Sequence, residues 1–437
     1  MPKSSLSYIE ISLVHNFQES FFRGSETMSD SKTSKVERLI EKGVRIDRPA
    51  SIEIGNDVDP GRISGDSVRI YSGCRLFGAD TLILPGVSLG HEAPVTIDNC
   101  QIGPDVELRG GYFKKAVFLG QNQAGLGSHV REATILEEQA NIAHTVALKQ
   151  TILFPFVTLG SLINFCDCLM AGGTSRKNHS EVGSSYIHFN YTPSQDKATA
   201  SLIGDVPRGV MLNQNPIFLG GQGGMVGPCR LGYGVTVAAG TILRKDETRS
   251  NRLIMGAAGK EANVSFKPGR FRNDKRIIAN NIYYIANLIA LKQWYDQVRR
   301  LFVADRFPPA LLEALGEKVD LAIDERLSRL EAVCLKKAIA DNAPPQSPKS
   351  KQARELSEHW PAIKDFLKMQ ASASAPAEVD RFLESIHQGI KTCGPDYICV
   401  IQGLDPADAA RGIGWLQGVV DDIAAGSRKI LPTFLST

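Results

Sequence analysis

The stretch Leu231-Gly-Tyr-Gly-Val-Thr-Val237-Ala-Ala-Gly-Thr-Ile-Leu243 decides the fold of this chain. Its aliphatic residues at 231, 237 and 243 repeat every six positions. An amphipathic helix repeats about every 3.6 residues and a half-buried strand about every two. A period of six is typical of a triangular solenoid in which each face carries one short strand. The aliphatic side chain points into the prism, and glycine with other small residues turns the chain at the edges.

Pairs of an aliphatic residue and a glycine recur along the chain before this stretch. They stand at Ile54-Gly55, Ile102-Gly103, Leu119-Gly120, Leu126-Gly127, Leu159-Gly160, Val182-Gly183, Ile203-Gly204, Leu219-Gly220 and Val226-Gly227. Because three faces make one coil, residues 47–245 predict about eleven coils of a left-handed parallel β-helix. An all-β sandwich is the alternative, but its strands would follow one another at about 8–12 residues.

The chain before the repeats is expected to be a leader and a cap. Residues 1–46 include a predicted helix over Lys35–Lys42 that closes the end of the solenoid, with Ser31 or Ser34 as its N-cap and Gly43 as its stop. The first 27 residues lack the basic and apolar regions of a signal peptide. Translation from Met28 is therefore an alternative start.

The pattern changes after the repeats. Residues 47–270 are predicted to form the β-helix, and residues 271–437 to be α-helical, with a linker rich in proline and serine near 341–352. Each coil of a solenoid is stabilised by its neighbours. We therefore expect the β-helix to fold without the C-terminal helices.

Composition predicts a cytoplasmic protein without a nucleic-acid or membrane partner. The net charge is only +3 over 437 residues, and no run of about 18 apolar residues occurs. The eight cysteines are scattered, and we expect them to be reduced thiols. Cys166-Asp-Cys168 is too tight for the usual zinc or redox spacing, so it predicts two buried small residues, and no metal site is expected.

Four segments resemble the acetyltransferase half of the bifunctional glucosamine-1-phosphate acetyltransferase and N-acetylglucosamine-1-phosphate uridyltransferase family. They are REATILEEQANIAHTVALK (131–149), GSLINF (160–165), SSYIHFNYTPSQDKATASLIGD (184–205) and FLGGQGGMVGPCRLGYGVTVAAGTILRKD (218–246). The stretch IEKGVRIDRPASIEIG (40–55) is similar to the start of that family's β-helix. The resemblance covers about residues 38–245. It implies acetyl-CoA as co-substrate and a homotrimer with sites between subunits. Because it includes no counterpart of the family's nucleotidyltransferase domain, uridyltransferase activity is not expected.

The resemblance implies a sugar-phosphate site. In the family an arginine and a lysine one coil apart bind the phosphate, and Arg131 and Lys149 match them. Two cations on one face can clamp one phosphate, and two solvated surface charges are the alternative. Asn190 and Tyr191 match an Asn-Tyr pair that contacts sugar and cofactor. Lys197 matches a further lysine near the phosphate, one residue later than the family spacing.

The same resemblance implies a groove for acetyl-CoA, and it shows that the family's catalytic histidine is absent here. Gly221, Ala238 and Ala239 match small residues that line the acetyl-CoA groove. The family's catalytic histidine stands in a Gly-His-Leu-Thr-Tyr segment. Ser161 replaces that histidine and Asn164 replaces the tyrosine, and both are still expected to contact the substrate. A serine at its ordinary pKa cannot take a proton from an ammonium near neutral pH.

Two other histidines are candidates for the general base. His179 lies in a polar insertion between Met170 and Val182, directly after the altered segment, and we expect this insertion to fold back over the same pocket. His188 is the second candidate. A surface-loop role for His179 and a wall position for His188 and His144 are the alternatives.

The sequence therefore predicts an acetyl-CoA-dependent acyltransferase that acts on an amino-sugar phosphate or a nucleotide sugar. Two other functions stay open. One is a sugar-phosphate-binding module that has lost its base, and the other is a structural trimer whose helices dock a partner.

Overall fold

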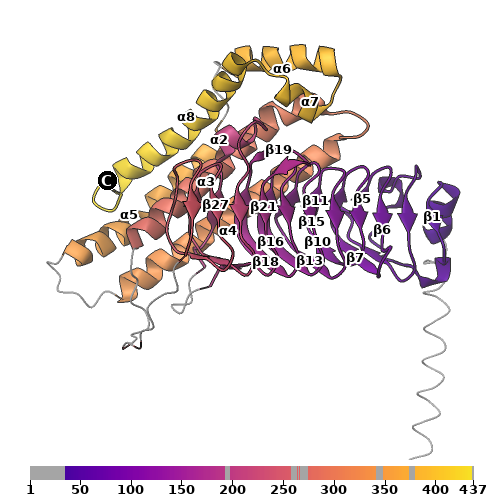
Figure 1. Ribbon diagram of the computed structural model, residues 1–437, viewed down its shortest axis with the longest axis horizontal. Helices are drawn as coiled ribbons and strands as arrows, with labels where there is room; N and C mark the ends of the chain where they lie inside the picture. Colours follow the sequence, from indigo (N-terminus) through magenta and orange to yellow (C-terminus); the bar gives the residue numbers. More distant parts are fainter. Residues whose placement is uncertain are drawn as a thin grey trace, which may run out of the picture.

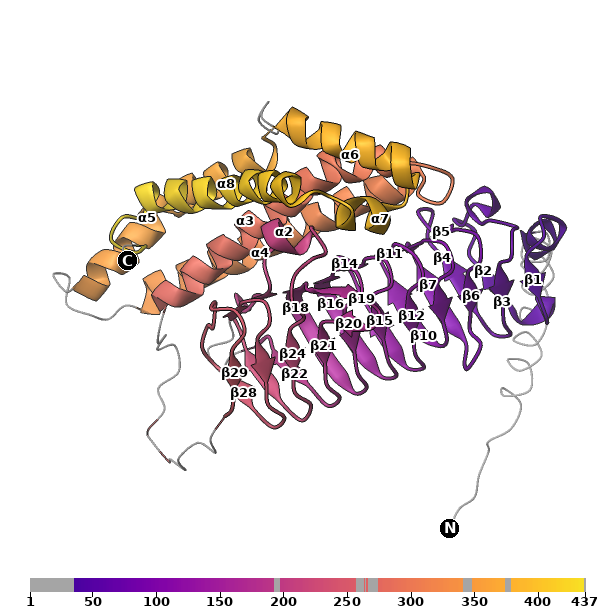
Figure 2. The same ribbon diagram turned by 45° about the horizontal axis from the view of Figure 1, so that its top comes forward.

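The chain folds into a prism of stacked coils with helices along one side (Figures 1 and 2). The computed structural model describes residues 35–191, 197–256, 263, 265, 274–340, 348–373 and 379–435. The parallel solenoid has about 11 turns, which confirms the predicted left-handed β-helix with a helical C-terminal region. A short helix over residues 35–41 begins the described chain, and Gly43 follows it with a φ of +109°. Ser31 and Ser34 lie outside the described residues.

The first face of the prism is an 11-stranded parallel sheet. In spatial order its strands are β1 (Arg45–Ile46), β3 (Arg69–Ile70), β6 (Ser88–Leu89), β9 (Glu107–Leu108), β12 (Gln123–Ala124), β15 (Asn141–Ile142), β17 (Thr158–Leu159), β21 (Glu181–Val182), β24 (Phe218–Leu219), β27 (Thr236–Val237) and β29 (Leu253–Ile254). Each strand pairs with the strand of the next coil, so residues at equal positions stack.

The second and third faces form one 16-stranded sheet that bends across an edge. The second face contains β2 (Glu53–Ile54), β4 (Arg75–Phe77), β7 (Val95–Asp98), β10 (Gly111–Lys114), β13 (Ser128–Val130), β16 (Val146–Leu153), β18 (Ile163–Met170), β22 (Ile187–Phe189), β25 (Gly224–Val226) and β28 (Ile242–Leu243). The third contains β5 (Leu82–Ile83), β8 (Gln101–Ile102), β11 (Ala116–Phe118), β14 (Thr134–Leu136), the second halves of β16 and β18, β23 (Ser201–Ile203) and β26 (Arg230–Leu231).

Three edges join these faces, and one coil shows where each lies. The first edge joins the first face to the second and contains residues 160–162, between β17 and β18. The second edge joins the second face to the third at Asp167, inside β18, where φ is +59°. The third edge joins the third face back to the first and contains residues 171–180, which include the hairpin of β19 (Gly173–Ser175) and β20 (Asn178–His179).

The helices that follow the solenoid are α3 (Asp274–Gln297), α4 (Pro309–Ala340), α5 (Pro348–Ala371), α6 (Asp380–Cys393), α7 (Tyr397–Gln402) and α8 (Pro406–Ile430), and the short α2 (Val206–Gly209) precedes them. Of these helices, α3 and α4 lie against the third face of the solenoid, and α5, α6 and α8 form a layer outside them (Figure 2). Helix α5 begins inside the segment predicted as a linker, and residues 341–347 lie outside the described residues. None of the described helices is long and apolar enough to cross a membrane.

An apolar column on the third face explains why the helices dock there. Its members, in register from coil to coil, are Val117, Ile135, Ile152, Leu169 and Leu202. They alternate along their strands with residues that fill the solenoid interior, yet each is at most 3% exposed. Helix α4 packs on β11 and β14, and α3 packs on β23. The helices therefore cover an apolar surface of the solenoid.

Buried polar contacts join the helices to the solenoid near α3. The Arg299 guanidinium forms an ion pair with Glu138 and lies 3.8 Å from the ring centroid of Tyr397. The Tyr295 hydroxyl donates a hydrogen bond of 2.5 Å to Glu137. Burial raises the pKa of the Glu137 carboxyl to about 7, although the positive charge of Arg299 lowers it.

The expectation that every cysteine is a reduced thiol is wrong. Cys393 and Cys399 form a disulfide, because the end of α6 and the start of α7 bring their Cα atoms to 6.2 Å. Scattered spacing in the sequence could not indicate this pair. Cys166 and Cys168 are buried and form no disulfide, as predicted.

Removal of the helices should destabilise the solenoid, in contrast to the expectation from coil stacking alone. A chain that ends at residue 270 would expose the apolar column on the third face, and exposed apolar surface of this kind drives association. We expect this chain to aggregate in light scattering. Threonine at positions 117, 135, 152 and 169 in the same chain should restore solubility. A soluble truncated chain without these changes would show that the helices are dispensable.

Glu137 should make stability depend on pH. Its folded pKa of about 7 lies above its ordinary value of 4.5, so its contribution to stability is fully present below about pH 4.5 and is lost as the pH rises through 7. Glu137→Gln should flatten the change in the denaturation midpoint between pH 5 and 8. His188 titrates in both proteins, so the difference between their pH profiles isolates Glu137. Identical pH profiles would contradict the burial argument.

Candidate functional site

A column of small and polar residues runs along the first edge. The strands β15, β17, β21, β24 and β27 are in register. The second residues after these strands therefore stack, and they are His144, Ser161, Ser184, Gly221 and Ala239. Backbone hydrogen bonds link them from coil to coil, for example from Leu162 N–H to His144 O at 3.1 Å. The structure thus brings three predicted site residues, Ser161, Gly221 and Ala239, onto one edge, with Ala238 directly before Ala239.

Ser161 makes a hydrogen bond that the sequence analysis did not predict. Its Oγ lies 2.8 Å from Nδ1 of His144, one coil earlier, and its backbone N–H donates to the Oγ of Ser184 at 3.1 Å. His144 is exposed on the edge, and Ser161 is half-buried. At the position where the resemblance places a catalytic histidine, this chain therefore has a serine that contacts another histidine. The separation of 17 residues, close to one coil, is a signal that could have revealed this pair.

His179 lies on a different edge from Ser161. The hairpin that carries it projects from the third edge, between β18 and β21, whereas Ser161 lies between β17 and β18. Arg176 holds this hairpin against the third edge by donating hydrogen bonds to the carbonyl oxygens of Gln139 and Phe156. The His179 Nδ1 lies 2.9 Å from the Arg176 carbonyl oxygen, and its Nε2 lies 3.6 Å from Glu181. The expectation that this insertion folds back over Ser161 is therefore wrong.

His188 points into the solenoid. Its neighbours Ile187 and Phe189 are exposed, but His188 is 1% exposed and its Nε2 lies 2.8 Å from the Oγ of Ser201. Burial lowers the pKa of His188 to about 4. It is a wall residue of the interior, and the prediction that it serves as a base for a substrate bound outside is wrong.

Arg131 and Lys149 occupy adjacent coils at the second edge. The Arg131 backbone N–H donates a hydrogen bond of 2.9 Å to the carbonyl oxygen of Leu148, which places the two cations side by side in the ladder. The Lys149 ammonium lies 2.7 Å from Glu132. Burial raises the pKa of Glu132, but the hydrogen bond from Lys149 lowers it, and the net shift is downward. Arg131 is exposed, and its guanidinium has no hydrogen-bond or ion-pair partner among the described residues.

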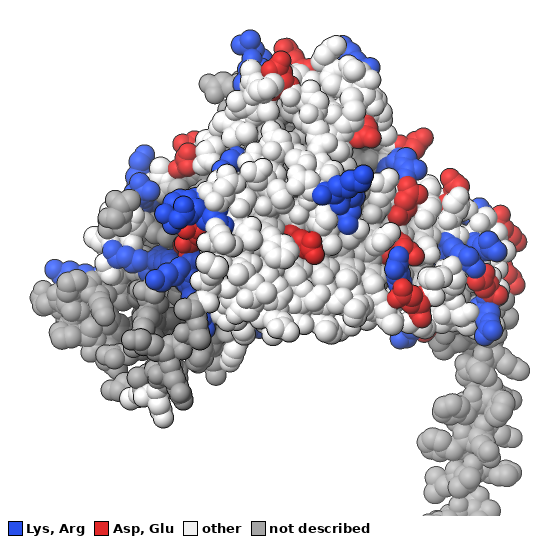
Figure 3. Space-filling model, in the orientation of Figure 1, with Lys and Arg blue, Asp and Glu red and all other residues white. Residues whose placement is uncertain are grey.

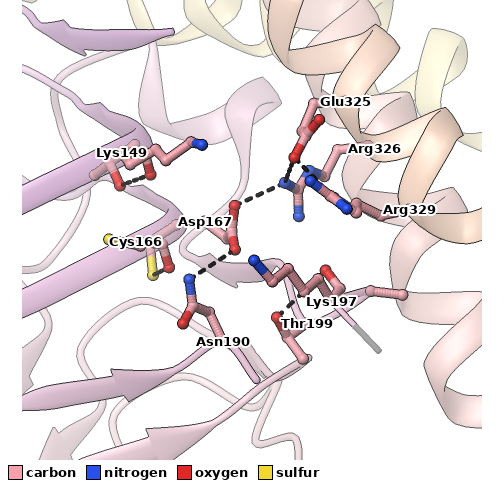
Figure 4. Close-up of polar contacts among 12 residues, drawn as sticks. Lys149, Cys166, Asp167, Asn190, Lys197, Thr199, Glu325, Arg326 and Arg329 are labelled. Carbon is pink, nitrogen blue, oxygen red and sulfur yellow. Dashed lines mark hydrogen bonds and ion pairs between the residues drawn. The ribbon is translucent and has the colours of Figure 1, made fainter. Parts of the chain in front are cut away.

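Asp167 connects this edge to the helices, as Figure 4 shows. Its Oδ1 accepts a hydrogen bond of 2.7 Å from Nη2 of Arg326 in α4, and its Oδ2 accepts one of 3.2 Å from Nδ2 of Asn190. The side chains of Asp167 and Arg326 are 8% and 2% exposed. Lys197 is exposed beside them, and Tyr191 is 57% exposed. Sequence reasoning missed Asp167 and Arg326, although a lone acid inside an apolar strand was a usable signal.

Asn164 lies on the second face between the two edges. It is exposed, and its Oδ1 accepts a hydrogen bond of 3.2 Å from the Cys166 thiol. The extended chain from Ile163 to Cys166 in β18 spans about 10 Å of this face. A ligand that touched both edges would therefore lie across Asn164.

Apolar side chains are exposed around the first edge. They are Leu126 and Leu162 on the edge, Ile187 and Phe189 on the second face, and Phe218 and Leu253 on the first face. Figure 3 shows few charged side chains over the middle of the solenoid, where an acidic and a basic group interrupt an otherwise uncharged surface. Among the described residues, no cluster of three histidine, cysteine or acidic side chains could hold a metal ion.

Comparison with known proteins finds relatives of about half of the chain. No family model matches the chain. The chain is 24% identical to the bifunctional protein GlmU of Thermotoga petrophila over 221 residues, which are 48% of this chain and 42% of that protein. For GlmU of Janthinobacterium sp. strain Marseille the values are 27% over 209 residues, 48% and 41%, and for GlmU of Ralstonia nicotianae they are 25% over 238 residues, 54% and 47%.

These matches confirm the resemblance inferred from the sequence. Proteins named GlmU cover about half of the chain, and the β-solenoid fits the acetyltransferase half of GlmU. They support a transferase of the sugar-phosphate acetyltransferase or nucleotidyltransferase kind. The chain spans less than half the length of these curated relatives.

Proposed function

We propose that this chain is an acetyl-CoA-dependent acyltransferase that acts on an amino-sugar phosphate or a nucleotide sugar. The hydrogen bond between His144 and Ser161 carries this proposal. The resemblance assigns the general base to the position of Ser161 and the acetyl-CoA groove to Gly221, Ala238 and Ala239. A histidine that contacts Ser161 on the same edge supports a base beside the groove.

His144 acts as the general base in this proposal. Imidazole is the side chain best suited to general-base work near neutral pH. The Ser161 hydroxyl donates its hydrogen to Nδ1 of His144, and its oxygen accepts a proton from the sugar amine. The amine nitrogen then forms a bond to the acetyl carbonyl carbon. The carbon–sulfur bond breaks, and coenzyme A leaves as the thiol once its sulfur takes the proton that His144 received.

Loss of His144 should remove most of the activity. Removal of a general base typically slows a reaction by about 10²–10⁴-fold, so His144→Ala should lose acetyl transfer to glucosamine-1-phosphate and still bind acetyl-CoA. Ser161→Ala should also be slow, because it breaks the proton path. His179→Ala is the matched control, and it should keep full activity since it lies on the third edge.

Two outcomes would oppose this assignment. Full turnover in His144→Ala would show that His144 is not the general base. A wild-type protein that binds the sugar phosphate tightly but transfers no acetyl group would favour the non-catalytic binding module.

The phosphate of the acceptor is proposed to bind at the second edge. Arg131→Ala and Lys149→Ala should each weaken binding of glucosamine-1-phosphate by roughly tenfold to a hundredfold, since each removes a charge-assisted contact. Lys177→Ala removes an equal charge from the third edge and should bind normally. Titration calorimetry measures all three. Unchanged affinity in the first two variants would make these residues solvated surface charges.

We also propose that the chain assembles as a homotrimer with sites between subunits. The exposed apolar residues around the first edge support a second copy there, since such patches mark interaction surfaces and closed rings hide them. The second face is flat, and a neighbouring subunit would give its ligand a second wall.

The mass in solution tests the trimer. Light scattering should give three times the chain mass of 47.5 kDa, and Leu253→Glu should reduce it because a charge then enters the apolar contact. Arg75→Glu, a charge change near the other end of the solenoid, should leave the mass unchanged. A monomeric wild type at micromolar concentration would exclude both the trimer and shared sites.

A further inference from the structure

The second edge contains more cations than the sequence resemblance assigns to it. Figure 4 shows the side chains of Lys149, Lys197, Arg326 and Arg329 extending toward the same space around Asp167. The first two come from the solenoid, and the two arginines come from α4. Basic residues from two separate parts of the chain therefore converge on one edge.

The charges at this edge do not cancel. Lys149 pairs with Glu132, Arg326 pairs with Asp167, and Arg329 Nε lies 2.8 Å from Glu325. The charged groups of Arg131 and Lys197 have no ion-pair or hydrogen-bond partner among the described residues. With each acid matched by one cation, two positive charges remain, which favours an anion here.

Arg326 also has an unpaired nitrogen, in the buried part of the site. Its side chain is 2% exposed, and Nη2 binds Asp167, but Nη1 is buried without a hydrogen-bond partner. A buried guanidinium nitrogen that lacks a partner is unfavourable. In Figure 4 this guanidinium faces the space between Asp167 and Lys197. The accessible area of Nη1 is below 1 Å², so a ligand oxygen completes its hydrogen bonds only when the neighbouring side chains move apart.

We propose that α4 forms one half of an anion site at the second edge, in which Arg326 and Arg329 bind the phosphate group of a phosphate monoester together with Lys149 and Lys197. The planar fork of arginine suits phosphate oxygens, and lysine adds a point charge. Arg326 keeps Asp167 through Nη2 and offers Nη1 to the ligand. The identity of the ligand as a sugar phosphate rests on the proposed function, whereas the anion site itself does not.

A purely structural role for these arginines is the competing interpretation. It fits Arg326, whose pair with Asp167 docks the helix on the solenoid. It does not fit Arg329, which pairs with Glu325 on its own helix and is 36% exposed, so that it adds nothing to docking. Arg329 and Glu325 are therefore the informative positions.

Phosphate binding to the full chain tests the proposal. Titration calorimetry with inorganic phosphate and with glucosamine-1-phosphate should show that Arg329→Gln weakens binding by roughly three- to tenfold. Glu325→Gln releases Arg329 from its partner and should tighten binding a few-fold, an effect that a structural role would not produce. Arg326→Lys, which keeps the charge but not the second nitrogen, should weaken binding with the thermal unfolding temperature close to that of the wild type.

Arg306→Gln is the matched control, since it removes an arginine that pairs with Asp105 of the solenoid elsewhere along the helical region. It should bind both ligands as the wild type does. The proposal is overturned if Arg329→Gln and Glu325→Gln bind phosphate like the wild type while Lys149→Ala binds it weakly. That result would leave the proposed acyltransferase intact. Weakened phosphate binding in Arg329→Gln, in a protein that transfers no acetyl group, would support the anion site and count only against the enzyme.

Discussion

The in-register stacking of successive coils is the constraint on which the rest of this structure depends. Parallel ladders place residues one coil apart directly above one another, as with His144 and Ser161 on the first edge. The interior accepts aliphatic side chains at nearly every coil because each must pack on the coils above and below. Polar side chains that a ligand can reach therefore lie on the edges and outer faces. A site built on this scaffold is a vertical column, and its members come from different coils.

Much of the fold could be predicted from the sequence because the period of six follows directly from this stacking. The edge to which an insertion belongs also follows from the period, when it is applied strictly. Two steps of six from Ser161 lead past Asp167 to residue 173, on the third edge, so the insertion with His179 cannot lie over Ser161. Nearness in sequence suggested otherwise. Three steps of six back from Ser161 lead to Ala143, and His144 is the next residue, because this coil is one residue shorter than the period.

Other features have no periodic signal. The ion pair between Asp167 and Arg326 joins residues 159 positions apart, and no repeat connects the helices to the coils. The direction in which His188 points depends on the register of β22, which the strand pairing reveals and composition does not. The third face gave a partial signal, because strands such as Ala116–Phe118 are apolar at every position, as expected of strands covered on both sides. What covers them could not be read from those residues.

Because Arg326 pairs with Asp167, the docking of α4 and the binding of a ligand at the second edge affect each other. Asp167 contacts Arg326 on one side and Asn190 on the other, so any molecule that orders this edge also favours the docked helix. By linkage, a change that loosens the helix reduces affinity at the edge by the same factor. The stability of the helical region would then depend on whether a ligand occupies the second edge. A second protein that bound the outer surface of the helices could in turn raise or lower the affinity of that edge for its ligand.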